Sequence, residues 1–334
     1  MSSIAIPTST PSRKPIRLPK VDLFLGIDGG QSSTTAVIGD ATGRVVGYGR
    51  GGPCNHVKTG DGRERFTGAI LACVTVACEQ AGLPQGRFKS LCAGFSGGPA
   101  DKENLLKELV PSELTFVTHD GLIALSGATA GAPGIIAIAG TGQLSFGRNA
   151  HGVTARAGGW GYVFGDEGGG FDLTRQALRA ALRQHEGWGP RTALHDRLLV
   201  ETGATDANDL LHRFYSTDFP RPRIAALSRL VDDVALEGDA VAQAILSNAA
   251  HHLAAYVAAV YAQLFTEPEP VVVAPIGGVW NSEIIRNKFH QLIELTDGQK
   301  VVAPRYGPAA GALIEAYRLA GLNVTLSNVP TEKD

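Results

Sequence analysis

The sequence predicts an α/β protein built from two similar units. Each unit opens with an apolar, β-prone run that ends in a glycine turn, at residues 21–30 and again at 134–142. Helical stretches and further buried strands follow each opening. At 334 residues, the chain has the length of about two domains of ordinary size. Weak internal duplication is therefore expected, with the boundary between the units near residues 121–130.

The first unit is expected to begin at Val21 and to open with a three-stranded antiparallel meander. After the opening strand, two β-prone runs at 34–38 and 45–48 are separated by turn-forming residues. An amphipathic helix is predicted over 62–82, where apolar residues recur at helical spacing. The unit then continues with a strand at 90–95, a helix at 101–109, a strand at 114–118 and a helix from 120 to about 128.

The second unit is expected to repeat this opening and then to become mainly helical. Strands at 134–139 and 144–146 flank its glycine turn, and helices dominate from about 171 to 265. The predicted ending is a strand at 270–275, the turn Gly277-Gly278, a helix at 281–295, a strand at 300–303 and a helix at 308–320. The small residues of this last helix, Gly311, Ala312 and Ala316, indicate a packing surface.

The composition favours a soluble protein that acts on a small metabolite. The chain has 30 Lys and Arg against 32 Asp and Glu, which leaves no excess positive charge for nucleic acid or acidic membranes. No apolar run reaches the ~18 residues that span a bilayer, and residues 1–20 lack the apolar stretch of a signal peptide. Cys54, Cys73, Cys78 and Cys92 have no metal-binding spacing and are too sparse for a disulfide scaffold. We expect a cytoplasmic protein with residues 1–20 as a flexible lead-in.

Two glycine turns are the candidate phosphate-binding loops. The first is Gly29-Gly30, followed by Ser32 and Ser33, and the second is Gly140-Thr141-Gly142 at the equivalent place in the second unit. Glycine lets the backbone N–H groups of a turn approach an anion. Asp28, which ends the first strand, could hold Mg²⁺ through water, although a hairpin with a solvated aspartate is the alternative. Two such turns in duplicated positions would bind a polyphosphate from two sides.

These turns resemble the loops of the actin, Hsp70 and sugar-kinase superfamily. Residues 28–30 with Ser32 are similar to its phosphate-1 loop, residues 140–142 to its phosphate-2 loop, and Ile276-Gly277-Gly278-Val279 to its adenosine loop. The run from Gly158 to Gly168 resembles the signature of N-acetylglucosamine kinases, within a wider family that also contains dehydratase and reductase activator ATPases. Two departures are Gln31 and Gln143, which stand where Gly and Ser are common.

The resemblance implies two actin-like (ribonuclease H-like) domains flanking a nucleotide and sugar cleft. The expected domains are residues 21–122, with the phosphate-1 loop and sugar contacts, and 123–305, with the phosphate-2 and adenosine loops. The last helix, at 306–322, is a candidate addition to the first domain. The implied ligands are ATP with Mg²⁺, and an amino sugar. The resemblance allows a homodimer and gives no reason to expect nucleic acid or a membrane as a partner.

Asp120 is the candidate catalytic base. It follows a strand and opens a helix, which places it at the domain junction, and helix capping is the alternative. Phosphoryl transfer to a sugar hydroxyl needs a carboxylate to accept its proton, and the resemblance gives Asp120 this role. By the same resemblance the sugar is bound by Asn55, Asp120, Gly159, Trp160, Gly161 and Asp166. Turn formation by Asn55 and core packing by Trp160 stay open as alternatives, and Ser96-Gly97-Gly98 forms either a cleft wall or a turn.

The implied function is ATP-dependent phosphorylation of the C6 hydroxyl of N-acetylglucosamine, which gives N-acetylglucosamine 6-phosphate. A kinase for glucosamine or N-acetylmuramate on the same scaffold is the alternative among sugar kinases. An activator ATPase of a dehydratase or reductase is a different class and would need cysteine ligands for an iron–sulfur cluster. All four cysteines precede residue 93, which argues against it. A sugar-sensing repressor would need a helix-turn-helix segment, for which the lead-in is too short.

Overall fold

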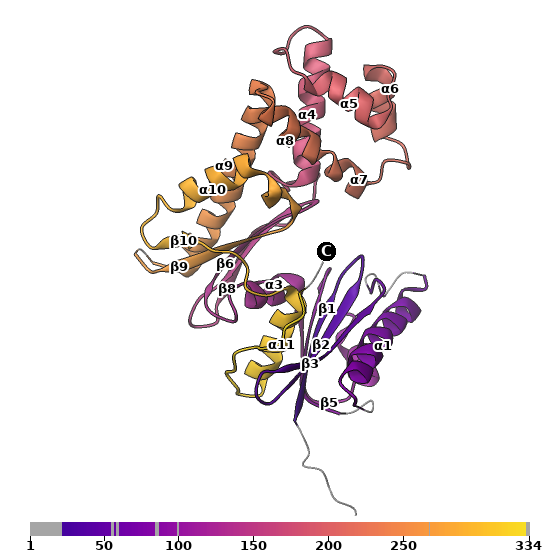
Figure 1. Ribbon diagram of the computed structural model, residues 1–334, viewed down its shortest axis with the longest axis vertical. Helices are drawn as coiled ribbons and strands as arrows, with labels where there is room; N and C mark the ends of the chain where they lie inside the picture. The colour runs from indigo at the N-terminus through magenta and orange to yellow at the C-terminus, as the bar shows by residue number, and fades with distance from the viewer. Residues whose placement is uncertain are drawn as a thin grey trace, which may run out of the picture.

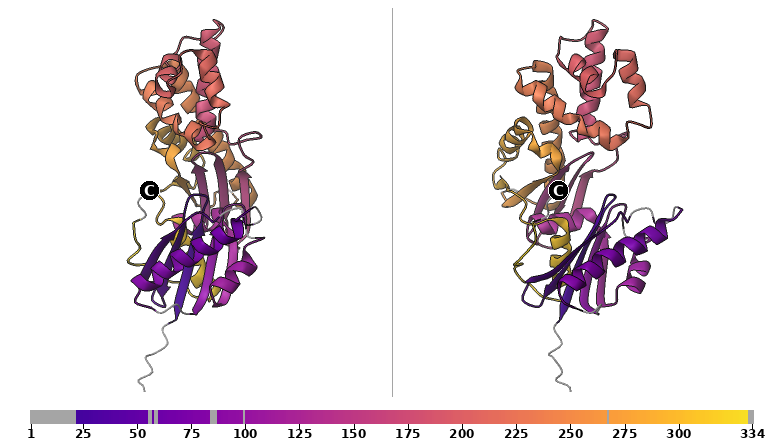
Figure 2. Two further views of the ribbon diagram at one scale, coloured as in Figure 1. Left: turned by 90° about the vertical axis from the view of Figure 1, so that its right-hand side faces the viewer. Right: turned by 45° about the vertical axis from the view of Figure 1, so that its right-hand side comes forward.

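Two mixed sheets of five strands form the framework of the molecule (Figures 1 and 2). The computed structural model describes residues 22–54, 57, 60–83, 87–98, 100–266 and 268–331. The strand order is β3-β2-β1-β4-β5 in the first sheet and β10-β9-β6-β7-β8 in the second. Read from β8, the second sheet repeats the first, with two antiparallel pairs followed by two parallel ones. The predicted α/β class and internal duplication are therefore confirmed.

The first sheet and its helices contain the predicted meander and the predicted helix–strand alternation. In chain order the elements are β1 (Leu23–Gly29), β2 (Thr34–Asp40), β3 (Val45–Gly51), α1 (Gly62–Gln80), β4 (Phe88–Phe95), α2 (Glu103–Leu109), β5 (Ser112–His119) and α3 (Asp120–Ala128). Helix α1 buries its apolar residues against this sheet, with Phe66, Ile70 and Cys73 inaccessible to solvent. The expectation of an amphipathic helix here is confirmed.

The second sheet is followed by a large helical region at the upper end of the molecule in Figure 1. Its elements begin with β6 (Gly134–Ala139), β7 (Gln143–Arg148), β8 (Thr154–Gly158), α4 (Gly170–His185), α5 (Leu194–Thr202), α6 (Ala207–Phe214), α7 (Arg221–Ala226) and α8 (Ser228–Leu236). They continue with α9 (Ala240–Leu264), β9 (Val271–Ile276), the 3₁₀ turn η1 (Gly278–Asn281), α10 (Glu283–Ile293), β10 (Gln299–Val301) and α11 (Pro308–Leu319). Strand β8 is an addition to the sequence prediction, and η1 delays the start of α10.

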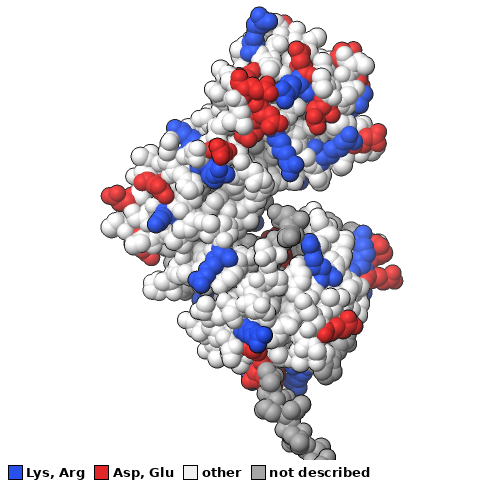
Figure 3. All heavy atoms as spheres, in the orientation of Figure 1, with Lys and Arg blue, Asp and Glu red and all other residues white. Residues whose placement is uncertain are grey.

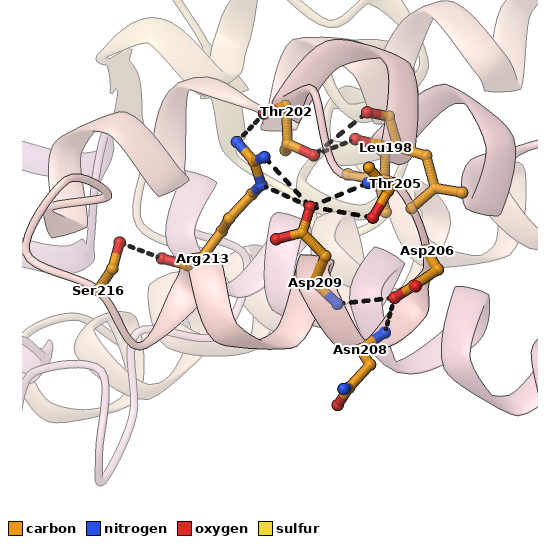
Figure 4. A network of polar contacts seen from close by, with 9 residues as sticks. Leu198, Thr202, Thr205, Asp206, Asn208, Asp209, Arg213 and Ser216 are labelled. Carbon is orange, nitrogen blue, oxygen red and sulfur yellow. Dashed lines mark hydrogen bonds and ion pairs between the residues drawn. The ribbon is translucent and has the colours of Figure 1, made fainter.

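Helices α5 and α6 are joined by polar contacts away from both sheets (Figure 4). Asp206 precedes α6, and its carboxylate accepts the N–H groups of Asn208 at 2.9 Å and Asp209 at 2.8 Å. Arg213 pairs with Asp209 at 3.1 Å and donates to the carbonyl of Thr202 at 2.9 Å. By accepting these two N–H groups, the carboxylate of Asp206 satisfies donors that have no partner inside the helix. Asp206 is thus an aspartate whose role is helix capping.

Helix α11 packs against the first sheet, although it follows the second sheet in the chain (yellow in Figure 1). A Cβ built on Gly26 of β1 would overlap the backbone of Leu313 in α11. A Cβ built on Gly311 would likewise overlap the carbonyl oxygen of Ile123 in α3. Backbone therefore meets backbone at both contacts, and glycine leaves the room for it. The packing role predicted for the small residues of α11 is confirmed, whereas the domain limits stay predictions.

We expect Gly311→Ala to lower the free energy of unfolding by about 1–3 kcal/mol, because α3 and α11 would have to separate. The added Cβ would overlap backbone atoms of Ile123 and Gly127, neither of which can rotate away. Gly68→Ala in α1 is the matched control, since its Cβ meets no atom within 4 Å and alanine stabilises a helix by about 0.5–1 kcal/mol. Chemical denaturation measures the free energy of unfolding of both variants. A Gly311→Ala protein as stable as the parent would contradict the close contact between α3 and α11.

A buried ion pair connects the second sheet to α11. Arg148 ends β7, and its Nη1 lies 2.8 Å from Oε1 of Glu315, with both side chains less than a tenth exposed. Ser126 of α3 donates a hydrogen bond to the same carboxylate, and Nη2 of Arg148 donates to the carbonyl of Gly131 at 3.3 Å. Removing one partner of a buried pair leaves an uncompensated charge. The pair therefore fixes the point where β7, α3 and α11 meet.

The surface carries charges of both signs. On the face shown in Figure 3, Lys and Arg lie among Asp and Glu, and the surface is indented between the upper and lower parts of the molecule. That face has no extended positive area of the kind that binds a nucleic-acid backbone. In the part of the chain that the structure describes, no helix combines the length and apolar character needed to cross a membrane.

Candidate active site

Three parallel strands of the first sheet bring the first candidate loop and Asp120 to one edge. In the register of β1, β4 and β5, Gly29 pairs with Phe95, and Phe95 pairs with His119. Loops that follow parallel strands gather at the carboxyl edge of a sheet, where ligands bind in α/β folds. Ser96 joins them, because its N–H donates to the carbonyl of Gly29 at 3.1 Å and its hydroxyl donates to Oδ2 of Asp120 at 2.8 Å. Ser96 therefore lies in a turn, closed by the hydrogen bond from the N–H of Gly98 to the carbonyl of Phe95 at 3.2 Å, and its place in a cleft wall stays a prediction.

Asp120 is the first residue of α3, but it does not cap the helix. The cap is His119, whose Nδ1 accepts the N–H of Leu122 at 3.3 Å. Burial lowers the pKa of His119, which keeps the imidazole neutral and able to accept. Oδ1 of Asp120 accepts the N–H of Gly121 at 2.9 Å, and Oδ2 accepts the hydroxyl of Ser96. The capping alternative is therefore wrong for Asp120. Its half-buried carboxylate accepts one hydrogen bond on each oxygen. The catalytic role of Asp120 stays a prediction.

We expect Ser96→Ala to lower turnover by roughly 10-fold or more, because Asp120 loses a charge-assisted hydrogen bond and with it a fixed orientation. The KM for the sugar should change much less if Ser96 acts only by orienting the carboxylate. Ser96→Thr keeps the hydroxyl and should retain most of the turnover. Steady-state kinetics of both variants provide the check, and equal activity of Ser96→Ala and the parent would remove Ser96 from the site.

The first glycine turn is closed by backbone hydrogen bonds. The N–H of Gly30 donates to the carbonyl of Ser33 at 2.9 Å, and the N–H of Cys54 donates to the carbonyl of Gly30 at 3.2 Å. Beneath the turn, a Cβ on Gly29 would overlap the ring of Phe95, so the strand end has no room for a side chain. Gln31 and Ser32 are exposed at the tip of the turn. The turn is therefore tight at its base and open to a ligand at its tip.

Asp28 suits a water-bound magnesium ion better than a site made only of protein ligands. It lies half-buried at the end of β1, just before the turn. No group of three or more His, Cys, Asp or Glu able to hold a metal occurs among the residues described. Mg²⁺ keeps several waters and commonly binds through one or two carboxylates together with phosphate oxygens. A single carboxylate beside a phosphate loop fits that coordination.

The second glycine turn lies against the start of α4. The N–H of Gly140 donates to the carbonyl of Gly142 at 3.0 Å, which closes the turn. From the helix side, the N–H of Gly170 donates to the carbonyl of Gly140 at 2.8 Å, and the N–H of Phe171 donates to that of Thr141 at 3.1 Å. A Cβ on Gly140 would meet no atom within 4 Å, so this side of the turn is open. The turn is thus fixed in place with open space beside it.

Asp166 lies beneath the second turn. Its side chain is 4% exposed, and its φ of 65° is in the left-handed region that few residues other than glycine adopt. Oδ2 lies 3.3 Å from Nη2 of Arg221, and Oδ1 accepts the N–H of Gln143 at 3.3 Å. A Cβ on Gly142 would lie 2.5 Å from Oδ2. Asp166 therefore supports the phosphate-2 loop in this structure, and its contact with a sugar stays a prediction.

The side chain of Gln143 takes no part in the turn that it follows. Its Oε1 and Nε2 are buried and have no hydrogen-bond partner in the described part of the chain. A Cβ on Gly158 would overlap Oε1, so the two strands β7 and β8 approach each other closely here. Leaving a buried amide unpaired costs free energy. Gln143 thus departs from the family pattern without a compensating contact in this structure.

The predicted sugar-side residues form an exposed turn after β8. Trp160 is 66% exposed, so the alternative of core packing is wrong. Its ring lies under the guanidinium of Arg156, 4.9 Å from the ring centroid. Gly159 and Gly161 have φ values of 73° and 80°, which explains why glycine stands on both sides of the tryptophan. Asn55, the remaining predicted sugar ligand, lies outside the described residues.

Glu167 has a specific partner that the sequence did not indicate. The hydroxyl of Tyr256 on α9 donates a hydrogen bond to its Oε2. Burial alone would raise the pKa of Glu167, but this hydrogen bond, a backbone hydrogen bond and the nearby His252 and Arg175 together hold the pKa below its ordinary value. The same contact and burial raise the pKa of Tyr256. Glu167 is therefore ionised and fixes the glycine-rich segment to α9.

The predicted adenosine loop lies directly against the phosphate-2 loop. Gly277 has a φ of 113°, and a Cβ on it would overlap the carbonyl oxygen of Ala139. Beside this loop is a cavity of about 200 Å³, whose polar lining comes from Ser228, Arg229, Asp232, Asp233, Asn281 and Ser282. Ser282 donates a hydrogen bond to Asp232. Sequence reasoning missed these residues; the one available signal was a serine four residues after Gly278, in place to cap α10.

The two similar sheets, each with a glycine turn after its central strand, define an actin-like ATPase fold. The chain belongs to the BadF/BadG/BcrA/BcrD ATPase family, whose model matches residues 25–316. The N-acetylmuramic acid/N-acetylglucosamine kinase of Clostridium acetobutylicum is 31% identical over 87% of this chain and 97% of its own length. The N-acetyl-D-glucosamine kinase of Dictyostelium discoideum is 31% identical over 70% of this chain and 77% of its own.

A solved structure agrees with these relatives. A protein from Chromobacterium violaceum, provisionally assigned as an N-acetylglucosamine kinase, superposes with a TM-score of 0.70 at 26% identity. The match covers 89% of this chain and 99% of that protein. The resemblance expected from the sequence is therefore confirmed for the fold, for the family and for its use of ATP.

Proposed function

We propose that this chain is an ATP-dependent kinase that phosphorylates the C6 hydroxyl of N-acetylglucosamine. The observation that carries the proposal is the position of Asp120, which Ser96 links by hydrogen bonds to Gly29 at the base of the phosphate-1 loop. In the proposed complex, this carboxylate faces a sugar hydroxyl that points to the terminal phosphate. The two relatives named as amino-sugar kinases support the choice of substrate.

The chemistry requires the sugar hydroxyl to lose its proton as its oxygen bonds to phosphorus. The carboxylate of Asp120 accepts this proton, and the bond between the γ-phosphorus and its bridging oxygen breaks as ADP leaves. The backbone N–H groups of the two glycine turns bind the phosphate oxygens. Trp160 offers an apolar face to the sugar ring. Mg²⁺, for which Asp28 is a suitable ligand, supplies neutralising charge on the phosphates when bound.

A coupled assay of ADP release tests the proposal with N-acetylglucosamine, glucosamine, N-acetylmuramate and glucose as acceptors. We expect ADP release that depends on an amino sugar, with the product phosphorylated at C6 by NMR. Activity on glucose alone would contradict the amino-sugar assignment. Phosphorylation of glucosamine in preference to N-acetylglucosamine would leave the kinase reaction in place and change the substrate.

An activator ATPase is disfavoured by the state of the cysteines. Cys54, Cys73, Cys78 and Cys92 are all buried around the first sheet. Burial raises the pKa of Cys73 to about 12, and it raises the pKa of Cys92 well above its ordinary value. An iron–sulfur cluster needs thiolate ligands. These cysteines would have to leave the core before they could bind one. A visible absorption band of an iron–sulfur cluster in anaerobically purified protein would reverse this conclusion.

A further inference from the structure

Arg221 lies beside the phosphate-2 loop, although it comes from the helical region. It is the first residue of α7, and a Cβ built on Gly142 would lie 3.2 Å from its Nη2. Its guanidinium lies over the ring of Tyr162, 5.1 Å from the ring centroid, and Nη2 lies 3.3 Å from Oδ2 of Asp166. Figure 1 shows α7 on the side of the helical region that is turned toward the first sheet. A positive charge therefore stands next to a loop that we propose to bind phosphate.

The position of α7 is fixed by its contacts with the start of α4. The hydroxyl of Thr174 in α4 donates to the carbonyl of Ile224 in α7 at 2.8 Å, and both residues are buried. A Cβ on Gly170, the first residue of α4, would lie 3.0 Å from the carbonyl oxygen of Ala225. The N–H of Gly170 also holds the phosphate-2 loop, through the carbonyl of Gly140. The first turn of α4 therefore holds both the loop and α7, and a charge that is already in place needs little reorganisation during a reaction.

Most of the hydrogen-bond donors of Arg221 are unused. An arginine side chain has five N–H donors. In the part of the chain that the structure describes, the one acceptor of its guanidinium is Oδ2 of Asp166, at a distance that is long for a bond between charged groups. The side chain of Arg221 is 41% exposed, whereas that of Asp166 is 4% exposed. The buried carboxylate therefore holds one end of the guanidinium and leaves its other donors available to a ligand.

We propose that Arg221 donates hydrogen bonds to the terminal phosphates of ATP and stabilises the charge on them during transfer. The γ-phosphoryl group passes from the bridging oxygen of ADP to the C6 oxygen of the sugar, and the proton of that hydroxyl passes to Asp120. Arg221 stays protonated throughout, and its planar guanidinium matches the spacing of phosphate oxygens. Asp166 then orients Arg221. The inference rests on the proposed function, since it assigns a further residue to the same reaction.

Arg221→Met, which removes the charge and keeps an unbranched side chain, tests the proposal. We expect kcat/KM for ATP to fall by roughly 10²–10³-fold, the range for removing one preorganised donor from a transition state. Calorimetry should show about 10–100-fold weaker binding of a non-hydrolysable ATP analogue, the equivalent of one or two hydrogen bonds to a charged group. Affinity for AMP, which lacks the terminal phosphates, should match that of the parent. Arg221→Lys keeps the charge without the fork and should fall between the parent and Arg221→Met.

Arg223→Met is the matched control, because Arg223 belongs to the same helix and also lies over an aromatic ring. Its guanidinium is 4.0 Å from the ring centroid of Phe219, and its Nη1 donates to the carbonyl of Asp218 at 2.8 Å. These contacts are with the segment before α7 and not with the phosphate-2 loop. Arg223→Met should therefore lose a similar cation–π contact and keep the kinetic constants and affinities of the parent. Melting temperatures of both variants show whether folding is affected.

A double variant separates contact with phosphate from support of the loop. Asp166→Asn removes the ion pair, and the amide oxygen can still accept the N–H of Gln143. If Arg221 binds phosphate, adding Arg221→Met to Asp166→Asn should weaken binding of the ATP analogue further. If Arg221 acts only by holding Asp166, the second substitution should add nothing, because the contact has already been lost.

Three results would overturn the inference and leave the proposed function intact. They are an unchanged kcat/KM for ATP in a folded Arg221→Met protein, no further loss in the double variant, and an equal loss of affinity for AMP and for the ATP analogue. A parent enzyme that binds the ATP analogue but phosphorylates none of the four sugars of the coupled assay would contradict the proposed function itself. Calorimetry would still test Arg221 in that case.

Discussion

Asp120→Asn is expected to lower turnover by roughly 10²–10⁴-fold, the usual range for a positioned acid–base group. Asparagine keeps the size of the side chain and can accept the N–H of Gly121 or the hydroxyl of Ser96, but it cannot take up the substrate proton. Because His119 caps α3, the substitution should leave the helix and the melting temperature almost unchanged. Sugar binding, measured by calorimetry, should persist, since an amide still contacts a hydroxyl.

Asp206→Asn is the matched control for Asp120→Asn. Asp206 also stands at the start of a helix, but its carboxylate accepts two helix N–H groups and caps α6. Asparagine is an equally good cap, so both stability and turnover should match the parent. An Asp120→Asn enzyme that keeps more than about a tenth of the parent turnover, well outside the range for an acid–base group, would show that Asp120 is not the base.

Gly142→Val should weaken ATP binding by about 10–100-fold, the equivalent of one or two hydrogen bonds to a charged group. The first atom of the new side chain would lie 2.5 Å from Oδ2 of Asp166 and 3.2 Å from Nη2 of Arg221. The turn must then move, or the Arg221–Asp166 pair must break, and in either case the N–H groups of the phosphate-2 loop are displaced. Sugar affinity should fall less, because the predicted sugar ligands other than Asp166 lie in other segments.

Calorimetry with a non-hydrolysable ATP analogue, and separately with N-acetylglucosamine, measures the two affinities. Gly68→Val controls for valine in place of glycine, since a Cβ on Gly68 meets no atom within 4 Å and the residue lies on the exposed side of α1. Unchanged affinity for the ATP analogue in a folded Gly142→Val protein would exclude this loop from the nucleotide site.

The regular elements with a strong burial pattern could be predicted from the sequence. Strands such as β6 and β9 are continuous apolar runs bounded by glycine, and α1 has apolar residues at helical spacing. Strand β8 lacks both signals, because Thr154-Ala155-Arg156-Ala157-Gly158 is rich in small residues and pairs on one side only. Its pairing with β7 decides that it is a strand, and the sequence of β8 alone does not reveal that partner.

The positions of the candidate site residues could be predicted where they follow directly from the end of a strand. The two glycine turns follow the buried strands β1 and β6, and Asp120 follows the edge strand β5, which places all three at the ends of strands. Contacts between distant residues could not be predicted: Ser96 with Asp120, Arg221 with Asp166, and Tyr256 with Glu167. The cavity near Gly278 is likewise assembled from α8, η1 and α10. Sequence reasoning therefore identified loops more reliably than the partners that hold them.

The return of α11 to the first sheet has a consequence for biosynthesis. The first sheet is complete once His119 has left the ribosome. The face that α11 covers includes Phe24, Val37 and Cys92, and it stays uncovered until residues 308–319 have been synthesised. At typical translation speeds of about 5–20 residues per second, the delay is on the order of 10–40 s. During that interval the nascent chain exposes an apolar sheet face to solvent or to chaperones. The amino-terminal half thus depends on the last helix, and a chain truncated before α11 would leave this face uncovered.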